Sequence, residues 1–62
     1  MPSHELTPFR AKVLATVATS RATRRSPTYL VGQAFGAALW LYEAGLIGKV
    51  GRGFYPLRTR GP

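Results

Sequence analysis

The stretch "YEAGLIGKVGRGFYPL", residues 42–57, decides how the C-terminal part of this chain folds. It contains two β-prone runs, "LIGKV" and "FYPL", joined by "GRG", which predicts a hairpin with a three-residue loop. Gly45 follows an apolar segment and is suited to the left-handed conformation that ends a helix. We therefore expect a helix that ends at Gly45, a strand, a basic turn and a return strand. Pro56 has no N–H to give to a ladder, so the return strand is predicted to lie at a sheet edge.

Residues 8–19 carry the signals of an N-terminal helix. Thr7 is suited to the N-cap position, and Pro8 is suited to the first helical position, where a missing N–H has no intrahelical partner to lose. The apolar residues that recur at helical spacing form one stripe: Phe9, Val13, Leu14 and Val17. This stripe is the face that we expect to pack against the rest of the domain.

The segment from Ser26 onward has two interpretations. After the polar stretch "SRATRRS", which we interpret as a loop, Ser26 and Pro27 repeat the cap-and-proline signal of the first helix. A second helix is therefore predicted to begin at Pro27. Because Gly32 and Gly36 interrupt the apolar sequence that follows, either one helix covers residues 27–44, or a short helix, a turn near residues 32–36 and a third helix share that span.

The composition favours a single small domain with a polyanionic partner. The chain has 62 residues and no cysteine, so packing or a partner surface must stabilise it without disulfides. Its formal net charge is +7, with nine Lys and Arg against two acidic residues. Unpaired cations strengthen association with nucleic acid or with an anionic membrane surface.

The order of three helices and a basic hairpin resembles the winged helix-turn-helix family. The similarity is strongest in "AALWLYEAGLIGKVGRGFYPL", residues 37–57, which is similar to a recognition helix, its A-G-L junction and a wing. The resemblance implies a mainly α fold with a C-terminal β-hairpin, a compact winged helix-turn-helix over residues 7–57. Residues 1–6 would form an N-terminal tail and residues 58–62 a basic C-terminal tail. In this family the recognition helix enters the major groove, and the wing contacts backbone or minor groove.

Double-stranded DNA is the partner that this resemblance and the charge indicate. The expected recognition helix is almost wholly apolar, and Gln33 is one of its two strongly polar residues. Since base edges are recognised by donors and acceptors, we expect phosphate contacts to dominate. The expected contact residues are Gln33 and the cations that flank the helices: Arg21, Arg24, Arg25, Lys49, Arg52, Arg58 and Arg60. Arg52, between two glycines at the hairpin tip, is the strongest single candidate. The protein would act as a transcriptional regulator or an architectural factor.

The apolar helix suggests a second class of function. Its large side chains exceed what so small a domain can bury, and aromatic residues are frequent anchors in protein interfaces. The predicted interface residues are Phe35, Leu39, Trp40 and Tyr42. They would pair two subunits of a homodimer or, in an adaptor such as a phage-type inhibitor, bind a host protein. A third alternative is a membrane span over residues 28–48, which carry Gly32 and Gly36 at GxxxG spacing.

Enzymatic activity has almost no support in the sequence. His4 lies in the expected tail, and Glu5 and Glu43 fall on different elements, so no catalytic pair can be named. No cofactor-binding motif and no metal-ligand cluster is present in the sequence. The apolar run begins too deep in the chain for a secretory signal, so we expect a cytoplasmic protein, associated with the nucleoid if it binds DNA.

Overall fold

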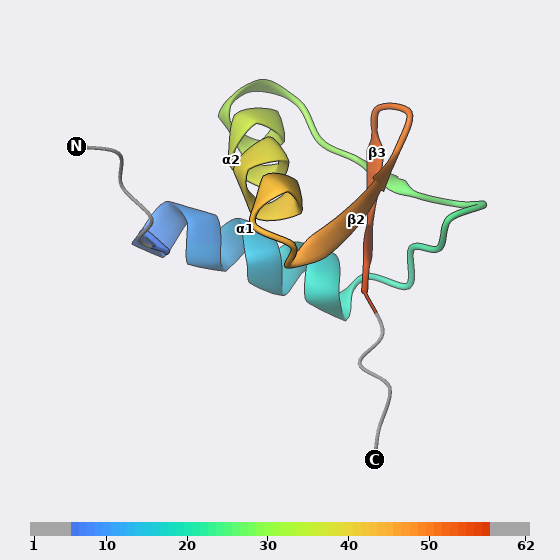
Figure 1. Ribbon diagram of the computed structural model, residues 1–62, viewed down its shortest axis with the longest axis horizontal. Helices are drawn as coiled ribbons and strands as arrows, with labels where there is room; N and C mark the ends of the chain where they lie inside the picture. Colours follow the sequence, from blue (N-terminus) through green and yellow to red (C-terminus); the bar gives the residue numbers. More distant parts are fainter. Residues whose placement is uncertain (1–5, 58–62) are drawn as a thin grey trace, which may run out of the picture.

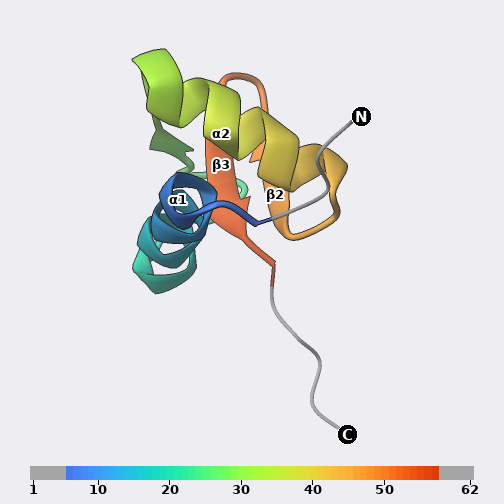
Figure 2. The same cartoon turned by 90° about the vertical axis from the view of Figure 1, so that its left-hand side faces the viewer.

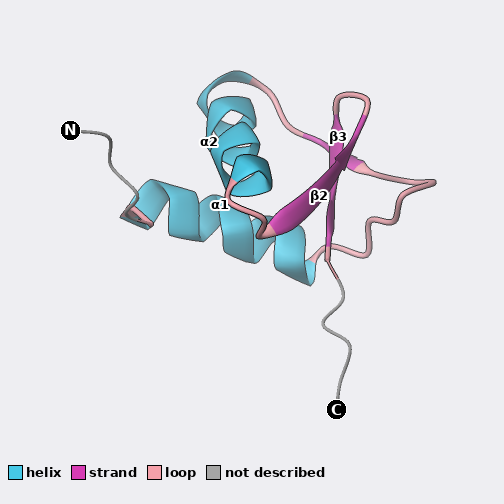
Figure 3. Ribbon diagram, in the orientation of Figure 1, coloured by secondary structure: helices cyan, strands magenta, loops and turns pink. Residues whose placement is uncertain are grey.

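In the computed structural model, which describes residues 6–57, the chain folds into two helices and a three-stranded antiparallel sheet (Figures 1 and 3). The elements follow the order α1, β1, α2, β2 and β3. Their bounds are Pro8–Thr19, Thr28–Tyr29, Gly32–Glu43, Ile47–Val50 and Gly53–Pro56. The described chain is therefore an α+β domain, with the expected C-terminal hairpin but one helix fewer than a helix-turn-helix with three helices.

Helix α1 confirms the sequence prediction at both ends. The Thr7 hydroxyl accepts the N–H of Arg10 at 3.2 Å, and Pro8 occupies the first turn. Val13 and Val17 are buried in the core, as the apolar stripe predicts. Phe9 departs from the stripe, because 45% of its surface stays exposed near the N-terminal end of the helix.

The prediction of a helix from Pro27 is wrong, and so are both interpretations of residues 27–44. Thr23 and Ser26 form a closed turn, in which each backbone N–H donates to the carbonyl of the other at 3.0 and 3.1 Å. The Ser26 carbonyl is therefore engaged by Thr23 rather than by a following helical turn. Thr28 and Tyr29 instead pair with Phe54 and Gly53 as strand β1.

Helix α2 begins later than predicted and ends where predicted. Gly32, at its start, has a φ of +61°, which a helix continuing from Pro27 would not allow. At the other end Gly45 has a φ of +82°, and its N–H donates to the Tyr42 carbonyl. The N–H of Leu46 donates to the Leu41 carbonyl, which completes a Schellman motif.

The length of α2 also bears on the membrane alternative. The apolar run of residues 28–48 is divided among β1, α2 and the start of β2, and α2 has 12 residues. A bilayer requires about 20 consecutive helical residues. Within residues 6–57, no helix combines the length and the apolarity that a membrane span needs.

The hairpin of β2 and β3 has a tighter turn than predicted. Val50 pairs directly with Gly53, so Gly51 and Arg52 alone form the loop. Gly51 has a φ of +60°, and no non-glycine residue described has a positive φ. A positive φ at the first loop position is the requirement of a type II′ turn, whose twist matches that of the strands.

The return strand β3 is central, because the strand order is β1-β3-β2. This contradicts the prediction of an edge strand. Strand β1 pairs only with Gly53 and Phe54, however, so Pro56 lies beyond its end. The missing N–H of Pro56 therefore interrupts no pairing with β1.

Both helices pack on one face of the sheet, which Figure 2 shows with the helices in front of the strands. Helix α1 contacts β3 and β2, and α2 contacts α1 and β2. The buried core comprises Val13, Val17, Ala37, Ala38, Leu41, Ile47 and Phe54.

Candidate nucleic-acid interface

The outer face of the sheet, away from the helices, carries two tyrosines and two glycines. Phe54 points into the core, so its neighbours Gly53 and Tyr55 lie on the opposite face. Tyr29 pairs with Gly53, and Gly48 pairs with Tyr55, which places all four on the same side. We call this surface, formed by Tyr29, Gly48, Val50, Gly53 and Tyr55, the outer face.

The glycines of the outer face are sites of close packing. The Tyr55 ring lies across Gly48, so a Gly48 side chain would overlap it. The ring of Pro27 covers Gly53, and a ring carbon of Tyr29 lies 3.3 Å from where a Gly53 side chain would begin. Both glycines are buried even though they face away from the core. Tyr29 is exposed on this surface, whereas Tyr55 and Pro27 are partly buried.

Arg24 binds directly to this surface. Its Nε donates to the Tyr55 hydroxyl at 3.4 Å, and its guanidinium carbon lies 5.9 Å from the centre of the ring. The hydrogen bond to Tyr55 raises the pKa of Arg24 above its ordinary value. Arg24 is exposed, so its charge remains available to a ligand.

A hollow of about 590 Å³ lies between the loop that follows α1 and the end of β3. Arg21, Arg24 and Tyr55 line it, and Leu57 forms part of its rim. The neighbouring Arg25 is exposed, and its backbone N–H donates to the Thr23 hydroxyl at 3.2 Å. We call residues 21–25 the arginine loop. The structure brings two of its three predicted contact residues into one aromatic-lined hollow.

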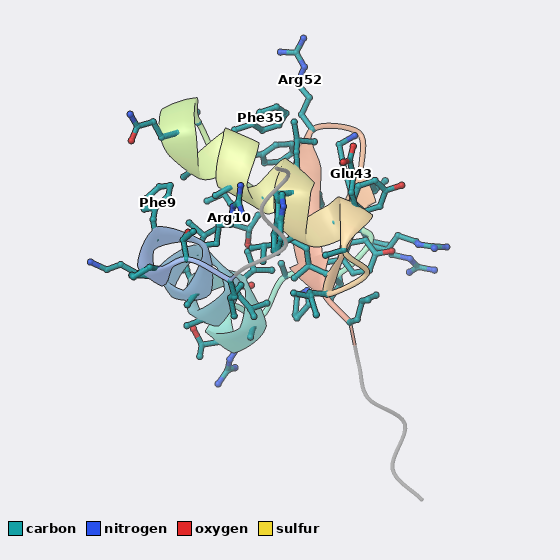
Figure 4. All side chains as sticks on the ribbon, turned by 60° about the vertical axis from the view of Figure 1, so that its left-hand side comes forward. Phe9, Arg10, Phe35, Glu43 and Arg52 are labelled. Carbon is teal, nitrogen blue, oxygen red and sulfur yellow. The ribbon has the colours of Figure 1, made fainter. Side chains whose placement is uncertain are left out.

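Arg52 projects from the hairpin turn beyond the body of the domain (Figure 4). A second hollow, of about 490 Å³, lies at its base and is mostly apolar. Tyr29, Val31 and Phe35 line this hollow together with Arg52. The tip of the hairpin and the start of α2 thus meet at the same end of the molecule.

The other two described candidates lie apart from these hollows. Lys49 is partly buried, and its ammonium lies 5.9 Å from the centre of the Tyr42 ring. Gln33 is exposed in the first turn of α2 and lines a separate hollow with Phe9 and Arg10. Arg58 and Arg60 lie outside the described residues. The predicted contact residues therefore do not form one continuous site.

The predicted protein-interface residues of α2 are mostly used inside the domain. Phe35 packs edge-to-face on Phe54, with ring centres 5.6 Å apart. Leu39 and Trp40 pack against the core cluster, and the Arg10 guanidinium lies 4.2 Å from the centre of the Trp40 ring. Tyr42 differs, because 45% of its surface is exposed.

Sequence reasoning missed Tyr29 and Tyr55 as candidate site residues. The helix predicted from Pro27 includes Tyr29, and Tyr55 falls within the β-prone run "FYPL". The alternation "GFYP" contained the signal, since an inward Phe54 requires an outward Tyr55. Chemically, the arrangement offers flat aromatic rings beside fixed positive charges.

Comparison of the chain with protein-family models, with characterised proteins and with solved structures finds no match.

Proposed function

We propose that this protein binds DNA through phosphate contacts, as a small transcriptional regulator or architectural factor. The hairpin would act as a wing and α2 as the recognition helix of a compact winged-helix arrangement. Two helices on one face of a β1-β3-β2 sheet are compatible with that arrangement. Phosphate contacts position a protein on DNA without reading its sequence, which suits an α2 poor in polar side chains.

The observation that carries the proposal is the surplus of exposed positive charge. Arg21, Arg24, Arg25 and Arg52 are all exposed, on the arginine loop and at the hairpin tip. Glu43 is the single acidic side chain among residues 6–57, so it can neutralise few of the cations there. Figure 4 shows Glu43 on α2 and Arg52 projecting from the hairpin turn. A surface with this balance attracts a polyanion at long range.

The salt dependence of DNA binding tests the proposal. A fluorescein-labelled duplex of random sequence is titrated with the protein at several salt concentrations, and anisotropy reports binding. If about five cations each neutralise one phosphate, the logarithm of the association constant plotted against the logarithm of the salt concentration will have a slope of roughly −4 to −5. Arg52→Ala should make that slope shallower by about one unit, because one phosphate contact is lost.

Lys12→Ala is the matched control for Arg52→Ala. Lys12 is an exposed cation of α1 and belongs to neither the hairpin nor the arginine loop. Its removal changes the net charge equally but should leave the slope unchanged. Equal effects of the two variants would indicate unspecific attraction and remove the wing from the proposal. Absence of binding at low salt would refute DNA binding altogether and favour a protein partner for the exposed part of α2.

A further inference from the structure

We propose that the outer face of the sheet is a stacking surface for unpaired bases, so that the protein holds single-stranded DNA more tightly than duplex. This inference rests on the proposed function, because it takes DNA to be the partner. It adds a second mode of contact, in which Tyr29 and Tyr55 stack on bases while arginines at the rim bind phosphates.

The spacing of the two tyrosines suits consecutive bases. Tyr29 stands opposite Gly53 on β3, and Tyr55 follows Gly53 by two residues on the same strand. The tyrosines are therefore diagonal neighbours on one face, with Cα atoms roughly 7–8 Å apart. An extended single strand can place adjacent bases on two such rings, and stacking on aromatic side chains is the usual means of binding unpaired bases.

Contacts with the glycines decide how firmly each tyrosine ring is held before a base binds. Because Gly48 has no side chain, Tyr55 can lie across it. Gly53 is covered by the ring of Pro27, and Tyr29 reaches only the edge of that contact, with a ring carbon 3.3 Å from where a Gly53 side chain would begin. Packing against a glycine also has a purely structural value, since it covers exposed backbone. However, Pro27 rather than Tyr29 covers Gly53, and 67% of the Tyr29 surface remains exposed. The Tyr55 ring is already held across Gly48, so it loses little conformational freedom when a base binds.

The charges around the outer face match a polynucleotide. Arg21 and Arg24 line the hollow at Tyr55, and Arg52 lines the hollow at Tyr29. Each tyrosine thus has an exposed cation within the same hollow, which is the combination of ring and charge that single-strand sites use. No acidic residue lines either hollow. Charge complementarity therefore selects a polyanion over an apolar peptide as the occupant.

Unpaired DNA is favoured over duplex by the position of the rings. Bases in a duplex are stacked on one another and show only their edges, so they cannot lie flat on a sheet face. A duplex would use only the arginines of this surface. A single strand would use the arginines and the two rings together.

The test compares two tyrosine variants on two forms of DNA. A labelled oligothymidylate of about 12 nucleotides, within the usual size range of single-strand sites, and a duplex of equal length are titrated at the same salt concentration. Tyr29→Leu removes a ring with 67% exposure, and Tyr42→Leu removes an exposed ring on α2 as the matched control. Tyr29→Leu should weaken oligothymidylate binding about tenfold and leave duplex binding nearly unchanged. Tyr42→Leu should change neither.

Tyr55 packs on Gly48, so it is tested without mutation. In NMR spectra of the wild-type protein, ring-proton signals of Tyr29 and Tyr55 should shift when oligothymidylate is added, while those of Tyr42 should not. Unshifted ring signals, or equal effects of Tyr29→Leu and Tyr42→Leu, would overturn the stacking surface. Tighter binding of oligouridylate than of oligothymidylate would overturn the assignment to DNA.

The outcomes separate this inference from the function on which it rests. Duplex binding with a steep salt slope, together with a Tyr29→Leu variant that binds oligothymidylate normally, would refute stacking and leave phosphate binding in place. Failure to bind either form of DNA at low salt would refute both. Preference for the single strand that disappears in Tyr29→Leu would support both.

Discussion

The two faces of the sheet are built from neighbouring residues of the same strand, yet they differ in burial and in the side chains that surround them. On the helix face, Phe54 is fully buried among apolar side chains of both helices. On the outer face, Gly53 and Tyr55 meet rings and an arginine that remain exposed to solvent. The comparison teaches that the helix face provides the stability of the domain, whereas the outer face is free to carry a binding surface.

The largest expected difference between the faces is in stability. Phe54→Ala should lower the free energy of unfolding by about 3–5 kcal/mol, because it removes a buried ring and leaves a cavity. That loss approaches the whole stability of a small domain, so we expect a largely unfolded variant. Tyr29→Ala, on the outer face, should change the free energy of unfolding by about 0.5 kcal/mol or less. Urea denaturation followed by circular dichroism checks both, and equal losses would contradict the division between the faces.

The outer face should nevertheless be sensitive at its glycines. Gly53→Ala places a methyl group against the ring carbons of Pro27, which cannot rotate away, and should cost about 1–3 kcal/mol. Gly48→Ala meets the outer end of the Tyr55 side chain, which can swing aside, so its cost should be smaller. Thermal unfolding of the two variants measures the difference. A Gly48→Ala variant less stable than Gly53→Ala would show that Tyr55 is the more rigid neighbour.

The smallest effect is expected at a glycine away from the sheet, with the opposite sign. Nothing lies within 4 Å of the place that a Gly36 side chain would take, and its φ is an ordinary negative one. Gly36→Ala should therefore stabilise α2 by about 0.5–1 kcal/mol, since alanine has less backbone freedom to lose. Denaturant unfolding of the variant and the wild type gives the sign of this change in the free energy of unfolding. A destabilised variant would mean that α2 needs a glycine at this exposed position for close packing.

Local signals in the sequence were sufficient for several elements. Thr7 and Pro8 define the start of α1, because a capping hydroxyl and a fixed φ act within one turn of the helix. Gly45 defines the end of α2, and Gly51 defines the hairpin turn, because both need a positive φ. In each case the deciding interactions lie within five residues along the chain.

The candidate site was only half predictable. The exposed arginines followed from the charge pattern, and the structure places Arg21, Arg24 and Arg52 on the surface as expected. The pairing of Arg24 with Tyr55 joins residues 31 positions apart, which no local pattern indicates. The combination of rings and charges that defines the outer face therefore required the tertiary structure.

The sequence by itself determined the first helix, the end of the second, the hairpin and the positive charge. Only the tertiary structure decided that Thr28 and Tyr29 form a strand, although Ser26 and Pro27 carry a helix-start signal. The physical reason is that β3 offers backbone partners on its free side, and Pro27 packs on Gly53 beside that pairing. Such contacts between distant segments outweigh a capping preference worth about 1 kcal/mol. They also place β3 at the centre of the sheet and bring Tyr29 of β1 and Tyr55 of β3 onto one outer face.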